Sequence, residues 1–196
     1  MRHELDVRAG RGPEARVLRR AQGRDYLKFL AEMHRALEPS WYLEIGTQTA
    51  ASLEFVTARS VAVDPAFALK HDVVSAKPEV HLVQDTSDAF FASGFLDRLG
   101  ARFDIAFLDG MHLYEYLLRD FINAERHMAP GGRIVMHDCL PWEPRMAARN
   151  RQTRAWTGDI WKIVPILKAY RPDLDVTIYD AAPTGLVVVG NLDPAN

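Results

Sequence analysis

The sequence of 196 residues predicts an α/β fold: one open sheet of seven strands with helices on both of its faces. Short apolar runs that suit buried strands alternate with helical segments from Trp41 to Met136. This alternation favours five parallel strands joined by right-handed crossovers. Two later apolar runs, 174–179 and 185–189, are separated by five residues, so we expect them to pair as an antiparallel hairpin.

The first 40 residues are expected to stand apart from this pattern, as an arm followed by one helix. Residues 1–22 carry six arginines and three acids without periodicity, which predicts a loose segment or one ordered by a partner. Asp25 can cap a helix that ends before Pro39. We expect this helix to cover a sheet edge or to contribute to a lid. Its predicted apolar face consists of Tyr26, Leu27, Leu30, Met33 and Leu37.

The repeating pattern predicts a single domain over residues 41–196. Parallel strands are expected at 41–46, 60–64, 80–83, 104–108 and 133–136. Helices are expected at 49–58, at 67–75, at 113–128 and from Gly158-Asp159 onward. Another helix is expected after Ser87 and Asp88, which can cap it. The apolar face of that helix would be Phe91, Phe95 and Leu99, and Pro130-Gly131-Gly132 is typical of a turn into the fifth strand.

Composition and charge exclude several classes of protein. A net charge of -2 argues against a nucleic-acid partner, and no apolar run approaches the length of a membrane span. The N-terminus lacks the apolar core of a secretory signal. The single cysteine, Cys139, cannot form an internal disulfide, which fits a cytoplasmic location. We interpret Cys139 as a small packed residue rather than a nucleophile.

Acidic residues follow three successive strands of the predicted sheet. Gly46 comes directly after the first strand, where a glycine lets the backbone approach a ligand and the next helix offers free N–H groups. Asp64 closes the second strand and can accept hydrogen bonds from ribose hydroxyls, while Asp85 after the third can accept from an adenine amino group. Either acid can instead cap a turn. Dinucleotide-binding loops usually carry three glycines, and this loop has one.

Acid and imidazole groups follow the fourth and fifth strands. Asp109 and His112 come after the fourth, and His137 and Asp138 come after the fifth. Because the carboxyl ends of neighbouring parallel strands share one crevice, we expect both sets of side chains in one site.

Three stretches of the sequence resemble those of class I S-adenosylmethionine-dependent methyltransferases: E-I-G-T-Q-T-A-A-S, V-A-V-D-P and L-D-G-M-H-L-Y-E-Y-L-L-R-D-F…A-P-G-G-R-I-V-M-H-D. The last is similar to a group that includes macrolide-sugar O-methyltransferases and relatives of cephalosporin-biosynthesis methyltransferases. The resemblance covers about residues 41–138 and implies a Rossmann-like methyltransferase sheet. It also implies that the cofactor contacts Glu44, Gly46, Thr47, Ser52, Asp64, Asp85, Thr86, Ser87 and Asp109.

The resemblance also implies methyl transfer, in which alignment of nucleophile, methyl and sulfur supplies much of the acceleration. Asp109 would lie near the reacting methyl, and His112 is the candidate base because imidazole titrates near neutral pH. His112 can instead hold the loop, and His137 faces the same alternative. Related enzymes often bind magnesium through three acids at these strand ends. Here Asp109 and Asp138 match, whereas His137 replaces an acid, so manganese or zinc would suit the site better than magnesium.

The segment that follows Asp138 is long for a connection, which is typical of a lid or binding loop. Trp142 and Trp156 can line a pocket for a ring-containing acceptor. Arginines at 145, 149, 151 and 154 can hold an anionic acceptor, or they can form a solvated charged surface.

The function predicted is S-adenosylmethionine-dependent methylation of a small-molecule acceptor, most simply at an oxygen, with no nucleic-acid or membrane partner. Two alternatives remain: an NAD-dependent oxidoreductase, and a cofactor-binding scaffold without catalysis. A homodimer is compatible with the short chain, although no particular residue indicates one.

Overall fold

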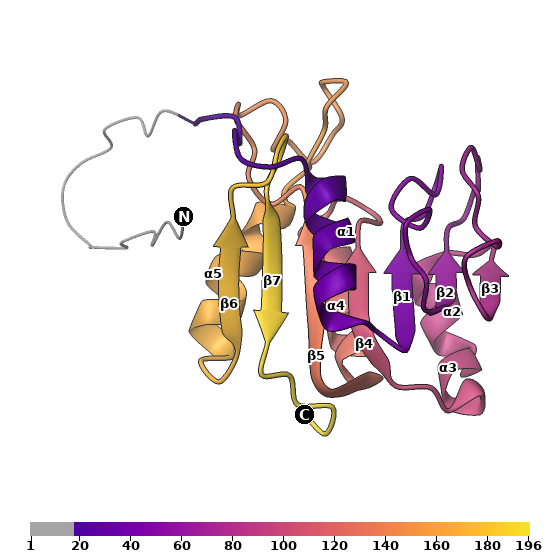
Figure 1. Cartoon of the computed structure of the whole chain (residues 1–196). Helices are drawn as coiled ribbons and strands as arrows, with labels where there is room; N and C mark the ends of the chain where they lie inside the picture. Colours follow the sequence, from indigo (N-terminus) through magenta and orange to yellow (C-terminus); the bar gives the residue numbers. More distant parts are fainter. Residues whose placement is uncertain (1–17) are drawn as a thin grey trace.

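Seven strands form one sheet in the order β3-β2-β1-β4-β5-β7-β6 in the computed structural model, which describes residues 18–196 (Figure 1). β1 to β5 are parallel and β6 pairs with β7 as an antiparallel hairpin, as predicted, and β7 joins this hairpin to β5, also in antiparallel orientation. Most of the predicted arm, residues 1–17, lies outside the described residues. The strands are β1 Trp41–Ile45, β2 Arg59–Val63, β3 Val80–Val83, β4 Phe103–Leu108, β5 Met128–His137, β6 Asp175–Tyr179 and β7 Leu186–Gly190.

The central strands are apolar on both faces because both faces are covered. Alternate residues of β4 enter two separate cores: Ala106 and Leu108 pack on one face, and Ile105 and Phe107 on the other. The first core receives the helices α2 Ser87–Ala92, α3 Phe95–Leu99, α4 Tyr114–Glu125 and α5 Ile163–Tyr170, the last preceded by the short 3₁₀ helix η1 Ile160–Lys162.

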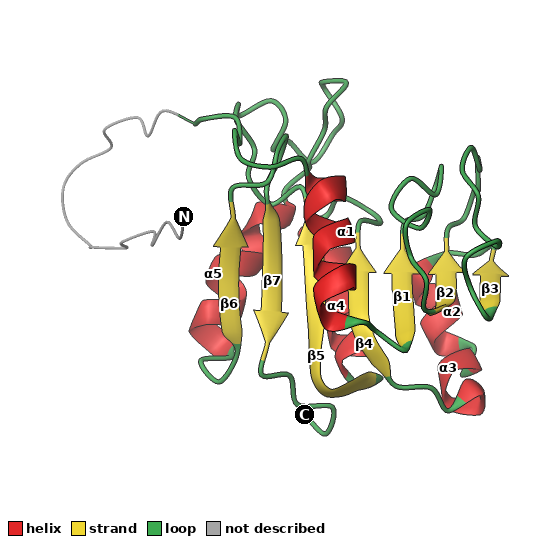
Figure 2. Cartoon of the chain, in the orientation of Figure 1, coloured by secondary structure: helices red, strands yellow, loops and turns green. Residues whose placement is uncertain are grey.

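The opposite face is covered by α1 Tyr26–Leu37 together with loops. Figure 2 shows α1 alone on the near face, with the other helices behind the sheet. Asp25 caps α1 by accepting from the N–H groups of Leu27 and Lys28, as predicted. Leu30 is fully buried, so α1 covers the middle of a face and not an edge, which corrects one of the two sequence-based expectations. Leu37, predicted to be buried, is half exposed because it lies on the outer side of the last turn.

The predicted helices at 49–58 and 67–75 are wrong, because both segments are loops. Gln48 and Ala50 have positive φ, which cannot continue a right-handed helix. The carbonyls of Gln48 and Thr49 accept from the N–H groups of Ala68 and Lys70, so the two loops bond to each other instead of each coiling alone. No helix N-terminus therefore follows β1, and the anion site expected there is absent.

Smaller differences concern element ends. The helix predicted after residue 87 is divided into α2 and α3 at Gly94, which has a positive φ, and Thr86 is the residue that caps α2. The helix predicted to reach residue 128 ends at Glu125, and β5 already begins at Met128, so the Pro-Gly-Gly turn lies within an irregular part of that strand. Within residues 18–196, no helix has the length and apolar character that a membrane crossing requires.

Candidate active site

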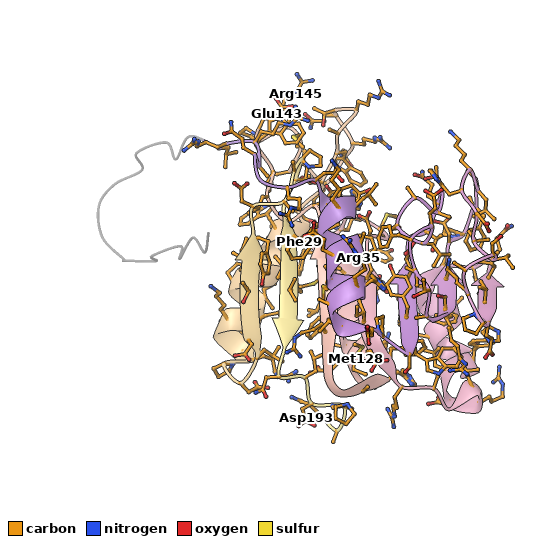
Figure 3. The ribbon with its side chains drawn as sticks, in the orientation of Figure 1. Phe29, Arg35, Met128, Glu143, Arg145 and Asp193 are labelled. Atoms are coloured by element: carbon orange, nitrogen blue, oxygen red, sulfur yellow. The ribbon has the colours of Figure 1, made fainter. Side chains whose placement is uncertain are left out.

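The loops after β1, β2, β3 and β4 meet along the carboxyl edge of the parallel strands. Backbone hydrogen bonds join them in series: Gly46 N donates to Val63 O at 2.8 Å, Asp64 N to Val83 O at 3.2 Å, and Asp109 N to Ile45 O at 2.8 Å. Figure 3 labels Glu143 and Arg145 in the loops above this edge, far from Met128 and Asp193 at the opposite end. The predicted site residues therefore line one edge of the sheet.

Gly46 is required by the packing of one loop on another. Its φ is +91°, and a Cβ atom there would lie 2.5 Å from the carbonyl carbon of Asp109 and 2.7 Å from the nitrogen of Gly110. The glycine therefore brings the β1 loop and the β4 loop into backbone contact, a reason that the sequence pattern did not reveal.

Glu44 is a fully buried carboxyl group at the end of β1. It accepts hydrogen bonds from the Tyr42 hydroxyl at 2.5 Å and the Ser52 hydroxyl at 2.9 Å. Burial raises its pKa to about 7. Through its hydrogen bond with Ser52, Glu44 thus fixes the loop that follows β1. Thr47, beside it, has a buried hydroxyl without a partner among the described residues.

The pKa of Glu44 predicts a pH-dependent stability. Because the folded carboxyl binds its proton more tightly than an unfolded one, its stabilising contribution is complete below pH 4.5 and is lost as the pH rises to about 7. Relative to a Glu44→Gln variant, whose amide does not titrate, the wild-type free energy of unfolding should fall by about 3 kcal/mol over this window. Urea unfolding of both proteins between pH 4.5 and 8 measures this difference, and a flat difference would contradict the prediction.

Asp64 and Asp85 both hold turns, the alternative that the sequence left open. Asp64 is nearly buried and accepts from the N–H groups of Gln48 and Ala66, each at 2.8 Å. Asp85 is exposed and accepts from the N–H of Thr86 at 2.8 Å. These bonds leave room for further acceptance, because each carboxylate oxygen has two lone pairs. Ribose and adenine contacts stay predictions.

Asp109, His112, His137 and Asp138 form a compact group, here called the His–Asp cluster. His137 Nδ1 lies 3.3 Å from Asp109 Oδ2 and 3.7 Å from Asp138 Oδ1. His112 Nε2 lies 3.5 Å from Asp109 Oδ1 and 3.4 Å from Asp138 Oδ2. The two loops meet as predicted from the parallel topology. Asp138 has a φ of +59°, an uncommon conformation for a non-glycine residue that often marks functional positions.

Charges within the His–Asp cluster shift its pKa values in opposite directions. Burial disfavours the charged form of Asp109, but His137 and His112 outweigh this effect and hold its pKa below the ordinary value. Burial also lowers the pKa of His112, but the two carboxylates overcome it and raise the pKa to about 9. At neutral pH, His112 is therefore protonated when only these side chains surround it, which does not suit the predicted role of a general base.

Two residues that the sequence did not indicate complete the surroundings of His137. The Tyr26 ring stacks on the imidazole with centroids 4.1 Å apart, and the Thr184 hydroxyl lies 3.2 Å from Nε2. Tyr26 begins α1, and Thr184 lies between β6 and β7, so both are far from His137 in sequence. No local pattern could have placed them there. Cys139 is buried and burial raises its pKa, which agrees with a packing role.

A family model described as a methyltransferase domain matches residues 22–139, a range that contains the whole His–Asp cluster. The chain belongs to this family of methyltransferases. No curated protein matches it.

Solved structures with the same fold include several methyltransferases. Another structure with this fold is that of cofactor-bound Rv0187 from MTB (20% identity, TM-score 0.63, 84% of this chain and 78% of that chain). The O-methyltransferase TomG from Streptomyces achromogenes, solved with SAM, has 19% identity and a TM-score of 0.61 over 84% of this chain and 78% of its own. An O-methyltransferase from Bacillus cereus, solved with SAH, has 17% identity and a TM-score of 0.60 over 90% and 84%.

The long segment 139–159 of this methyltransferase packs against the β4 loop. Trp156 O accepts from His112 Nδ1 at 2.7 Å, and Asp159 Oδ1 accepts from Tyr114 N at 3.0 Å. Arg149 is paired with Glu115 and Asp159, so its charge is already compensated. Of the four arginines that could hold an anion, Arg149 thus has a structural role, and Arg145 and Arg151 donate to main-chain carbonyls of the same segment.

Proposed function

We propose that this methyltransferase transfers a methyl group from S-adenosylmethionine to an oxygen of a small-molecule acceptor. The observation that carries the proposal is the His–Asp cluster at the carboxyl edge of the parallel strands, in a chain that belongs to the methyltransferase domain family. Support comes from the shared fold of O-methyltransferases solved with SAM and with SAH. An NAD-dependent oxidoreductase is disfavoured by the single glycine after β1.

The cofactor would lie along the loops after β1 to β4. Asp64 would hold the ribose, and Asp85, Thr86 and Ser87 would flank the adenine. Gly46, Thr47 and Asp109 would lie near the methionine portion. Glu44 and Ser52 would support the loop that contacts the cofactor, since Glu44 is fully buried and accepts a hydrogen bond from Ser52.

Replacing Asp64 with asparagine is expected to weaken S-adenosylhomocysteine binding by about tenfold, since a charge-assisted hydrogen bond contributes roughly 1.5 kcal/mol more than none. Asparagine keeps the shape of the side chain and one acceptor oxygen for the turn at Ala66, but it loses the hydrogen bond from Gln48 N–H, so thermal unfolding checks that the variant is folded. Calorimetry measures the affinity, and Asp88→Asn is the control because Asp88 pairs with Arg119 on the surface. Wild-type affinity in Asp64→Asn would contradict the ribose assignment, and tight NAD binding would favour the oxidoreductase.

Catalysis would depend on Asp109 and His112, which lie at the convergence of the two loops. Their task is to align the acceptor with the methyl and sulfur of the cofactor and to stabilise the hydroxyl as it loses its proton. The segment 139–159, which packs on the β4 loop, would exclude water from the site. A cofactor-binding scaffold, the rival function, would bind S-adenosylhomocysteine but show no transfer of labelled methyl to any member of a panel of small hydroxylated acceptors.

A divalent cation fits the donor atoms of this site. Asp109, His137 and Asp138 each offer one atom, and these atoms lie within 4.8 Å of one another. Asp109 Oδ1 is buried and forms no hydrogen bond with any of the described residues. When bound, such a cation would lower the pKa of an acceptor hydroxyl. The imidazole favours manganese or zinc over magnesium.

A further inference from the structure

We propose that this methyltransferase has a second small-molecule site, a cavity between α3 and the end of α4, and that this site takes a singly charged carboxylate with an apolar body. The site goes beyond the proposed function and does not depend on it. Three properties of the cavity support the proposal: an apolar floor, a rim of hydrogen-bond donors, and a positive charge.

The cavity has the size and the floor of a small-molecule site. Its volume is about 360 Å³, within the range of about 300–1,000 Å³ that such sites occupy. Leu96 and Ala101 are buried and Phe91 packs on the core, so these three side chains give the cavity an apolar floor. The apolar part of a ligand would be removed from water there, which favours binding.

Hydrogen-bond donors reach the same cavity from two connections. Arg102 precedes β4, Arg126 and His127 lie between α4 and β5, and Asn123 belongs to the last turn of α4. A backbone hydrogen bond of 2.9 Å from Phe103 N to His127 O holds the two connections together. Within residues 18–196, the side chains of Asn123, Arg126 and His127 form no hydrogen bond or ion pair. Their donors are therefore available to a ligand.

The two arginines differ in what they do for the fold. Arg102 donates through Nη1 to the main-chain carbonyl of Arg126 at the end of α4, where a positive charge compensates the helix dipole. The guanidinium of Arg126 makes no such bond to any carbonyl of the described chain. Its planar fork of N–H groups matches the two oxygens of a carboxylate. Arg126 is therefore the side chain that we assign to the carboxylate of the ligand.

The charge of the rim favours one negative charge on the ligand. Two arginines and one aspartate, Asp97, surround the cavity, which leaves a single positive charge when His127 is neutral. Burial lowers the pKa of His127, and Arg102 and Arg126 lower it further against the opposing effect of Asp97, so the imidazole is neutral at pH 7. A neutral imidazole still donates one hydrogen bond. A monocarboxylate thus balances the rim, whereas a phosphate dianion would exceed its charge.

The cavity lies at the opposite end of the sheet from the His–Asp cluster. Arg102 comes directly before β4, and Asp109 comes directly after it. The 6 residues of β4 span roughly 20 Å. Figure 1 shows α3 at the lower end of the sheet, away from the loops that follow the parallel strands. A ligand in this cavity would therefore leave the cofactor loops free.

The test is a titration of the isotope-labelled full chain with phenylacetate at pH 7, followed by NMR. Phenylacetate joins one carboxylate to one ring and serves as the probe for the unidentified ligand. We expect saturable shifts in the backbone amide signals of Gly100, Ala101 and His127, with a Kd of about 1 mM. Phenylacetamide, which is neutral, and acetate, which lacks the ring, should each bind about tenfold more weakly.

Arg126→Gln should weaken phenylacetate binding by about tenfold, because it removes the charge-assisted hydrogen bonds and keeps most of the side-chain length. Arg98→Gln is the matched control. It removes the same charge from α3, but Arg98 donates to Ser93 O at 2.8 Å and does not line the cavity. Its affinity for phenylacetate should stay within about twofold of wild type, since solvent and salt screen a charge at that distance. Thermal unfolding checks that both variants are folded.

The inference would be wrong if phenylacetate gave no saturable shifts at the cavity, if phenylacetamide or acetate bound equally well, or if folded Arg126→Gln kept the wild-type affinity. The arginines would then serve only the ends of the helices. None of these results bears on S-adenosylhomocysteine binding or on methyl transfer, which test the proposed function separately.

Discussion

Asp109→Asn is expected to lower the rate of methyl transfer by about a thousandfold, a loss within the range for groups that act directly on the reacting atoms. The two oxygens of Asp109 face His112 and His137, and these imidazoles hold the group as a carboxylate against the opposing effect of burial. An amide of the same size cannot supply that charge to either imidazole. Transfer of labelled methyl at saturating S-adenosylmethionine measures the effect.

The fold of the Asp109→Asn variant should be retained. The main-chain N–H of Asp109 donates to Ile45 O, and its carbonyl packs on Gly46, so neither contact involves the carboxylate. The thermal midpoint should nevertheless fall, because His112 and His137 lose a buried carboxylate partner, so methyl transfer is compared per folded molecule. Asp88→Asn, which removes a surface carboxylate paired with Arg119, controls for a general effect of lost charge. Activity within tenfold of wild type in Asp109→Asn would exclude the assigned role.

The position of the site could be predicted because it depends on repeating local patterns. Apolar runs of strand length predict parallel strands. Because residues 109 and 138 directly follow neighbouring strands, they lie side by side for any conformation of the rest of the loops. The surroundings of the site could not be predicted in this way. Tyr26 reaches His137 because α1 covers a face of the sheet, and Thr184 reaches it because β7 pairs with β5. Both contacts depend on long-range packing.

The two predicted helices failed for a related reason. The segment after Gly46 contains alanines and regularly spaced apolar residues that favour a helix by propensity. In the fold, Leu53 and Val56 are fully buried. The positive φ of Gln48 and Ala50 turns the chain so that these two side chains enter the core. Tertiary burial therefore outweighs local preference, and hydrogen bonds to residues 68 and 70 replace those that a helix would have made.

Gly46→Ala is expected to have the largest effect on stability, a loss of about 3–5 kcal/mol in the free energy of unfolding. Two costs combine: alanine is strained at a φ of +91°, and its methyl group would overlap the backbone of Asp109 and Gly110. Backbone cannot rotate away as a flexible side chain can. The β4 loop must therefore move, and because that loop carries Asp109, the folded fraction should also lose methyl transfer. Urea unfolding measures the stability.

Gly131→Ala separates these two costs. Gly131 has a similar φ of +79°, but a Cβ atom there would meet nothing within 4 Å, so only the conformational strain applies. We expect a loss of about 1–2 kcal/mol for Gly131→Ala and full activity per folded molecule, since the residue lies in the turn far from the His–Asp cluster. The difference between the two variants then measures how tightly the β1 loop holds the Asp109 loop. If both variants lost the same free energy of unfolding, the Asp109 loop would be able to move away from residue 46 at no cost. The close approach at Gly46 would then have no part in positioning the His–Asp cluster.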